Sequence, residues 1–423
     1  MGHWANKYVI GLTGNIAMGK SAVRKLLEHL GAYTIDADAL AHQTMMPGAP
    51  AYLPVIETFG RWVLDRDGKI DRSKLSAVVF SHPEALARLE AITHPLVGQG
   101  IDTLISRAKQ PIVVIEAIKL LESKLVDKVD AIWVVDCTPE LQLRRLIEKR
   151  GMSEQEARRR IEGQNSQREK LARANVVITN NGTPQELWAQ VEAEWNKLLA
   201  ALKLRRREET QVVSVTPPSA APPTQPAIPS PPATAQPSAP RTDTLPSQPA
   251  AQQTPPQPSV AIPVDVRRGM PKDAEQIAQV LNRMLGKNMS RMDVLTAFGE
   301  KSYLLAEING AIVGLTGFQV ENLVARADEF LLLPEAPIGP VARALIQAVE
   351  NASKELQSEI GFVYLPLDAA AQVVQIFLAS GYERVELEAI QVLAWREAAQ
   401  ESQPPNTQIF AKKLRPDRVL KPV

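Results

Sequence analysis

The sequence has little that would tie it to an oxidising compartment or to a membrane. Its 423 residues include one cysteine, Cys137, so no disulfide can form within the chain. No run of about 18 apolar residues occurs. Residues 1–6 have neither the basic start nor the apolar core of a secretory signal. We therefore expect a cytoplasmic protein without a membrane partner.

The chain also lacks an excess of charge of either sign. Its 48 Lys and Arg against 47 Asp and Glu give a net charge of +1, whereas proteins that bind nucleic-acid phosphates usually present a basic surface. No nucleic-acid partner is expected. With 45% hydrophobic and 22% charged residues the composition is that of globular domains, and the length favours two or three of them.

Proline, in contrast, is concentrated in one stretch. Residues 211–263 hold 16 of the 33 prolines, and their only charged residues are Arg241 and Asp243. A segment so poor in apolar surface cannot offset the entropy lost on ordering. We predict a disordered linker over 206–263 between a first domain, 7–205, and a second, 264–415. A proline-rich ligand for a partner domain is the alternative.

The first domain alternates strand-like and helix-like segments. Short apolar runs predict strands, and capping residues predict the starts of helices after Thr138, Ser153 and Thr183. Cys137 follows one of these runs and is expected to be buried rather than nucleophilic. Apolar strands alternating with helices indicate an α/β fold with a parallel sheet covered on both faces. The predicted strands are 7–13, 33–36, 112–116, 131–136 and 175–179, and a helix is predicted over 19–30.

A phosphate-binding loop lies between the first strand and the first helix. Residues 14–21, GNIAMGKS, fit the pattern G-x-x-x-x-G-K-[ST]. The two glycines let successive backbone N–H groups point at phosphate oxygens, the lysine reaches the β- and γ-phosphates, and the serine hydroxyl can ligate Mg²⁺. The sequence therefore predicts ATP and Mg²⁺ as ligands. The nucleotide-binding residues expected in this segment are Gly14, Ala17, Met18, Gly19, Lys20, Ser21 and Ala22, with Ser21 as metal ligand.

Two aspartates mark the acceptor side. The second strand ends in a segment that contains Asp36 and Asp38. Residues i and i+2 of a strand face the same side, so both side chains are predicted to point together from the carboxyl end of the sheet. Phosphoryl transfer to a hydroxyl needs a carboxylate that accepts the hydroxyl proton. Spacing alone does not choose between the two, and a pair of surface or capping aspartates is the structural alternative.

The motifs taken together resemble the dephospho-coenzyme A kinase family over about residues 7–200. The resemblance includes residues 11–21, Asp36-Ala37-Asp38, the segment 89–97 with His94 and Pro95, residues 120–125, 142–146 with Arg150 and Gln164, and Asn181-Gly182. It implies an enzyme, a P-loop kinase with helical substrate and lid segments. Its reaction would be ATP-dependent phosphorylation of the ribose 3′-hydroxyl of dephospho-coenzyme A, the last step of coenzyme A biosynthesis.

The resemblance also assigns roles to residues. Asp38 would be the catalytic base, with Lys20 as its partner in catalysis. Asp36 would support the magnesium shell or the loop, and His94 would lie where the coenzyme A moiety docks. One or two of the arginines near the lid are expected to reach nucleotide. They are Arg144, Arg145 and Arg150, whereas Arg158, Arg159 and Arg160 are expected on the surface.

Several positions depart from the family pattern. The family usually has glycine where Asn15 and Ala17 stand. It often has a proline near Ile118 and an apolar residue at Lys119. Asn175 replaces a common aspartate. None of these positions is in the pair Lys20 and Asp38, so the departures bear on substrate affinity more than on activity.

The residues after the linker predict a smaller α+β domain. Strands are predicted at the start of this region, at 303–307, 311–317, 330–333 and 361–365, and helices near 273 and over 341–356; Asn309-Gly310 indicates a hairpin turn. This order resembles the GNAT acetyltransferase fold. The stretch 334–341, where that family binds a pyrophosphate, has two prolines and one glycine, so we expect a degenerate domain with an unknown ligand or protein partner.

Two other functions stay open at this point. One is a P-loop kinase of another small hydroxyl compound, such as shikimate or a nucleoside. The other is a coenzyme A-sensing or scaffolding protein that acts through its C-terminal domain. The segment around His94 and the context of Asp36 and Asp38 speak against the first, and the presence of Lys20 and Asp38 speaks against the second.

Overall fold

The computed structural model describes residue 4 and residues 6–213 and 263–417. By internal contacts, residues Met1–Lys197 and Pro263–Val423 form one compact unit and Leu198–Ile262 a second. Most of the predicted linker, 214–262, lies outside the described residues. Where the linker was predicted to begin, at 206, the structure instead continues a helix, Pro184–Val213. In the described part of the chain, no helix combines the length and the hydrophobicity that a membrane span needs.

The first sheet has five parallel strands in the order β2-β3-β1-β4-β5. The predicted α/β class and parallel sheet are therefore confirmed. The strands are β1 Tyr8–Thr13, β2 Tyr33–Asp36, β3 Ile112–Glu116, β4 Ala131–Asp136 and β5 Val176–Thr179. The helices are α1 Lys20–His29, α2 Ala37–Thr44, α3 Tyr52–Phe59, α4 Arg72–Ser81, α5 Pro83–Arg107, α6 Pro139–Arg150, α7 Glu154–Glu162, α8 Gln167–Ala172 and α9 Pro184–Val213.

Helix starts follow the capping residues seen in the sequence. The hydroxyls of Thr138 and Ser153 accept hydrogen bonds from the first turns of α6 and α7. At the start of α9, Thr183 and Glu186 form a capping box, in which each side chain accepts a hydrogen bond from the other residue's backbone N–H. Such bonds satisfy N–H groups that the helix itself leaves unpaired.

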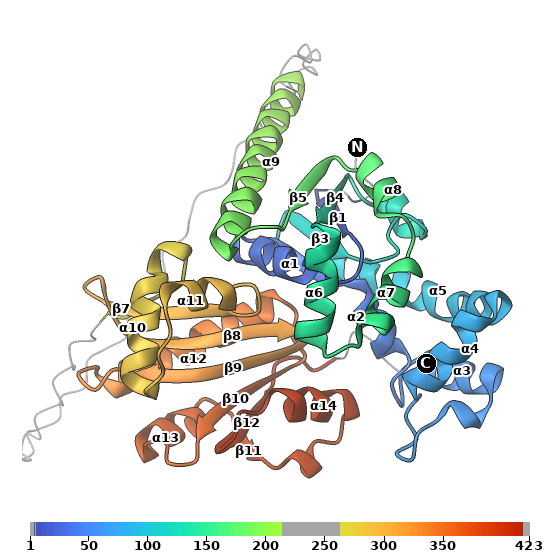
Figure 1. Cartoon of the computed structure of the whole chain (residues 1–423). Coiled ribbons are helices and arrows are strands. Elements are labelled where there is room, and N and C mark those ends of the chain that lie inside the picture. The colour runs from blue at the N-terminus through green and yellow to red at the C-terminus, as the bar shows by residue number, and fades with distance from the viewer. Residues whose placement is uncertain (1–3, 5, 214–262, 418–423) are drawn as a thin grey trace, which may run out of the picture. The chain divides into compact units, whose positions relative to one another are not determined.

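The second sheet is mixed and has seven strands, in the order β11-β12-β10-β9-β8-β7-β6. Figure 1 labels its strands β7 to β12. Strands β9 and β10 pair in parallel and the other neighbours are antiparallel. The strands are β6 Asp265–Arg268, β7 Ser302–Ile308, β8 Ala311–Glu321, β9 Val324–Leu332, β10 Ile360–Pro366, β11 Glu383–Val385 and β12 Thr407–Lys413. The helices are α10 Ala274–Leu285, α11 Arg291–Ala297, α12 Ile338–Glu355, α13 Ala371–Ala379 and α14 Leu393–Ser402.

The predicted hairpin is confirmed, but the strand predicted over 311–317 continues to Glu321, and the one predicted over 330–333 differs more. Asn309 and Gly310 take positive φ angles of 52° and 78°, as a two-residue hairpin turn requires. The strand predicted over 330–333 begins earlier, at Val324. Its first half alternates apolar residues with charged ones such as Arg326 and Asp328, and pairing with β8 and β10 makes it a strand despite those charges.

The two sheets share one hydrophobic core. A single cluster of buried apolar side chains includes Val9 and Ile35 from the first sheet and Leu304, Val320 and Phe410 from the second. Polar contacts cross the same boundary, since Lys25 Nζ on α1 donates to Val320 O at 3.0 Å and Arg268 donates to Glu28 O at 3.0 Å. The C-terminal region therefore covers one face of α1.

A buried histidine on α1 lies in this boundary. His29 is 6% exposed and its ring contacts Trp188 and Phe298 edge-on, with centroid distances of 5.6 and 5.2 Å. Burial lowers the pKa of His29 to about 4. The hydrogen bond with the Lys25 backbone carbonyl and the charge of Glu28 oppose this shift, whereas the positive charges of Arg268 and Lys25 add to it. His29 is thus neutral in the folded protein near pH 7.

We expect acid to destabilise the protein through His29. Between pH 6.5 and about 4 the unfolded chain binds a proton at this histidine and the folded chain does not. The free energy of unfolding therefore decreases as the pH is lowered, by about 3 kcal/mol over the whole window. Urea unfolding at pH 7.5 and pH 5 should show a larger loss for wild type than for His29→Phe, which cannot titrate. Equal losses in the two proteins would contradict this.

Candidate active site

The phosphate-binding loop connects β1 to α1 and depends on its two glycines. Gly14 and Gly19 have φ angles of +147° and +99°, both in a region that other residues rarely adopt. A Cβ atom at Gly14 would lie 2.5 Å from Val135 O, and one at Gly19 would lie 2.0 Å from Asn180 Nδ2. Ala17, where the family has glycine, is also at positive φ, 61°. The first N–H groups of α1 follow directly and have no partners within the helix.

Side chains from the lid segment and from the end of β5 hold this loop in place. Asn180 Nδ2 donates to Met18 O at 3.0 Å, and Gln142 Nε2 donates to Ile16 O at 2.9 Å. Gln164 Oε1 accepts from Ile16 N–H at 2.7 Å. Their role was not predicted, although Gln142 and Gln164 belong to the family resemblance. The loop backbone is thus fixed before any ligand binds.

The serine of the loop is bonded to a carboxylate that sequence reasoning did not single out. Ser21 Oγ donates to Glu116 Oε1 at 3.0 Å, and Arg24 Nε donates to Glu116 Oε2 at 2.8 Å. Glu116 is 4% exposed at the carboxyl end of β3, next to β1. A charged residue that ends an otherwise apolar strand, Ile112–Glu116, was the available signal.

The loop lysine is buried among acidic groups. Lys20 is 7% exposed, and its Nζ donates to Asn15 O at 3.3 Å. Burial lowers the pKa of Lys20, while Glu116, Asp38 and Asp36 raise it. A second lysine, Lys170, fixes the Asn15 side chain, donating to Oδ1 at 2.8 Å. An anionic ligand at this place would meet a poorly solvated ammonium group, where electrostatic attraction is strong.

The two aspartates are not both on a strand, which corrects the geometry predicted for them. Strand β2 ends at Asp36, and Asp38 is in the first turn of α2. Asp36 caps that helix by accepting from Ala39 N–H at 2.9 Å, so the capping alternative holds for this residue. Asp38 Oδ2 accepts from Ile118 N–H at 3.1 Å. Burial raises the pKa of Asp38, with the Ile118 bond opposing the shift.

Two cavities meet at Asp38. One, of about 430 Å³, is lined by Lys20, Ser21, Asp36 and Glu116. The other, of about 780 Å³, is lined by His94 and by the lysines Lys119, Lys124 and Lys128, together with apolar residues of α5. Among the described residues Asp38 alone lines both cavities. It is therefore placed between the phosphate loop and a second site large enough for an extended ligand.

The lid arginines divide into three kinds. Arg145 donates to the carbonyls of Ala17, Met18 and Asn180 and so braces the loop. Arg150 lines the cavity of Lys20. Three others form surface pairs within their helices, namely Arg144 with Glu148, Arg158 with Glu154 and Arg160 with Glu156. Arg150 is thus better placed than Arg145 to reach a ligand in the cavity.

The residues of the cavity fit a magnesium ion that arrives with a nucleotide. Among the described residues, no group of three or more His, Cys, Asp or Glu forms a metal-binding cluster. Ser21, Asp36 and Glu116 nevertheless line one cavity with hard oxygen atoms. Mg²⁺ is usually held by one or two protein oxygens together with phosphates and water, so these donors suffice.

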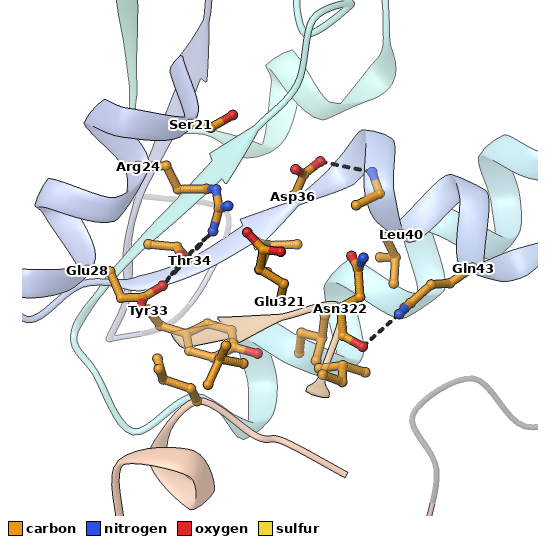
Figure 2. Close-up of a pocket in the computed structure, with 16 residues that line it drawn as sticks. Ser21, Arg24, Glu28, Tyr33, Thr34, Asp36, Leu40, Gln43, Glu321 and Asn322 are labelled. Carbon is orange, nitrogen blue, oxygen red and sulfur yellow. Dashed lines mark hydrogen bonds and ion pairs between the residues drawn. The ribbon is translucent and has the colours of Figure 1, made fainter. Parts of the chain in front are cut away.

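The C-terminal region reaches the same place. Glu321 and Asn322, at the turn between β8 and β9, line the cavity of Lys20 and also an adjoining pocket of about 210 Å³. Figure 2 shows the Glu321 side chain in this pocket between Arg24 and Asp36, and the bond from Gln43 Nε2 to Asn322 O, 2.6 Å long. The wall of the site therefore comes from both regions of the chain.

Known proteins resemble parts of the chain. Residues 8–186 match a family model described as dephospho-CoA kinase. The dephospho-CoA kinase of Geobacter sulfurreducens is 43% identical over 192 residues, which cover 45% of this chain and 98% of that protein. That of Thermobifida fusca is 41% identical over 197 residues, 46% of this chain and 98% of that protein. A putative acetyltransferase from Salmonella typhimurium, solved with acetyl-CoA, covers 37% of this chain and 98% of its own at 10% identity, with a TM-score of 0.30.

Proposed function

The chain belongs to the dephospho-CoA kinase family, and we propose that it phosphorylates the ribose 3′-hydroxyl of dephospho-coenzyme A with ATP and Mg²⁺. The observation that carries the proposal is the position of Asp38 between the phosphate-loop cavity and the larger, lysine-edged cavity. Phosphate donor and hydroxyl acceptor would then meet at one carboxylate.

In this mechanism the loop N–H groups and Lys20 hold the β- and γ-phosphates. Asp38 takes the proton of the attacking hydroxyl, a new O–P bond forms, the bond from the γ-phosphorus to the bridging oxygen breaks, and ADP leaves. The raised pKa of Asp38 makes it a stronger proton acceptor. Mg²⁺, held by Ser21 with Asp36 and Glu116 behind it, would neutralise phosphate charge. Arg150 adds positive charge from the lid side.

The second cavity has three lysines that would contact the phosphates of an acceptor, beside the carboxylates of Glu90, Asp102 and Glu122. Lys119, Lys124 and Lys128 line it, and two of them are paired, Lys119 with Glu90 at 3.1 Å and Lys128 with Asp102 at 2.7 Å. The departure at Lys119 therefore places a cation in the acceptor cavity. His94 lies there as well, as the resemblance implies, and would contact the coenzyme A moiety.

The substrate is tested by measuring ADP release from the full chain with Mg-ATP. Dephospho-coenzyme A, shikimate and nucleosides are offered in turn, and we expect turnover with dephospho-coenzyme A. ATP binding without turnover on this acceptor, or turnover with another one, would contradict the proposal.

We further propose that residues 7–205 carry this activity, that 206–263 connect it to the second domain, and that the domain 264–415 does not transfer acetyl groups. What supports the last point is the start of α12. Pro337 is its N-cap and Pro340 lies in its first turn, so this end has fewer N–H donors for a pyrophosphate. Nearby Glu335, which is paired with Arg283, stands where a basic residue would help to bind a pyrophosphate.

A further inference from the structure

The catalytic cavity has a wall that the family relatives do not share. Fewer than half of this chain's residues match 98% of the length of the two relatives named above. The cavity of Lys20 and Asp38 is also lined by residues from the C-terminal region, namely Arg326 on β9 and Ala394, Ala398 and Glu401 on α14. The C-terminal region thus adds side chains to a site that the first region alone would leave open on this side.

Arg326 is a buried cation with unused hydrogen-bonding capacity. Its side chain is 10% exposed, and one amino group donates to Glu321 Oε2 at 3.0 Å. Its Nε is buried and has no partner among the described residues. A guanidinium has five N–H donors, and burying one with so few partners is costly unless an anion completes them.

The partner that Arg326 does have can give way. The Glu321 side chain is 41% exposed, so it can turn to water with little loss when a stronger acceptor arrives. Phosphate is such an acceptor, because a guanidinium binds two of its oxygens at once. Lys20 and Arg150 line the same cavity, so phosphate is also the ligand chemistry of that cavity.

Three contacts fix the wall that carries Arg326. Asn322 O accepts from Gln43 on α2, Val320 O accepts from Lys25 on α1, and Glu397 on α14 pairs with Lys69 at 2.5 Å. Because the wall is tied on three sides, Arg326 is preorganised rather than brought in by a large movement.

We propose that Arg326 binds a phosphate group of a nucleotide substrate in the kinase cavity, so that the C-terminal region supplies part of the kinase site. The proposal rests on the proposed function. ATP and dephospho-coenzyme A both carry phosphates, and the test has an arm for each.

The experiment compares full-length wild type with Arg326→Ala and Arg326→Lys. KM and kcat are measured for ATP and for dephospho-coenzyme A separately, and binding of each nucleotide is measured by calorimetry. For the substrate that Arg326 contacts, we expect Arg326→Ala to raise KM and Kd about tenfold or more, and Arg326→Lys to recover part of the loss. Glu321→Gln, which removes the competing carboxylate, should lower the same Kd.

Arg283→Ala is the matched control, since it breaks another Arg–Glu pair of the same region, with Glu335, away from the cavity. It should leave KM, Kd and kcat at wild-type values. Unchanged Kd values for both nucleotides in Arg326→Ala would overturn the proposal, as would a fall in Tm that accounts for all of the loss. If Arg326→Ala weakens nucleotide binding but wild type does not phosphorylate dephospho-coenzyme A, the result would overturn the proposed function and leave the role of Arg326 in place.

Discussion

Replacing Asp38 by asparagine should lower kcat by about 10²–10⁴-fold, the usual contribution of a general base. Asparagine has the same shape and keeps an oxygen that can accept from Ile118 N–H, as Asp38 does at 3.1 Å. It cannot accept the proton of the attacking hydroxyl. The measurement is ADP release at saturating ATP and dephospho-coenzyme A.

The matched control for this change is Asp71→Asn. Asp71 caps α4 by accepting from Ser73 and Lys74 N–H, and asparagine caps a helix about as well as aspartate. We expect wild-type kcat and an unchanged Tm. A similar loss of kcat in both variants, or wild-type kcat in Asp38→Asn, would show that Asp38 is not the base.

The second large effect is expected for Gly19→Ala. The alanine would have to adopt φ +99°, and its Cβ would lie 2.0 Å from Asn180 Nδ2. Backbone strain of about 1–3 kcal/mol adds to the loss of the bond from Asn180 to Met18 O, about 1 kcal/mol, unless the loop moves. A displacement of the loop by about 1 Å is enough to lower activity roughly 100-fold. The strain is measured as a lower Tm, and the displacement of the loop as a lower kcat/KM for ATP.

Gly286→Ala separates the clash from the backbone penalty. Gly286 ends α10 at φ +61°. No atom of the described residues lies within 4 Å of the place that an alanine Cβ would take, so alanine there costs about 1 kcal/mol of backbone strain without a clash. ATP turnover should be unaffected. If Gly19→Ala behaves like this control, the close approach of Asn180 does not matter for the loop.

Local patterns were sufficient for most of the elements. Strands β2, β3 and β4 have the predicted bounds, because each is a short apolar run with clear ends. The prediction failed where long-range pairing decides, as in the first half of β9, and where one residue changes the path of the chain, as at Asp36, which ends a strand and caps a helix.

The site was only partly visible in the sequence. The loop is a continuous motif, so Lys20 and Ser21 could be found without a structure. Glu116 is 95 residues from Ser21 in the chain and reaches it because β3 lies beside β1. Arg326 comes from a different sheet. Neither residue belongs to a local pattern that specifies a partner.

The sequence by itself determined the phosphate loop, the parallel sheet that presents it and the family, because these depend on residues close together in the chain. Only the tertiary structure decided that the C-terminal region covers α1, that Asp38 lies where two cavities meet, and that Arg326 and Glu321 face the catalytic cavity. The physical reason is that burial and pairing between distant segments depend on how the two sheets pack into one core, and periodicity and composition do not encode that packing residue by residue.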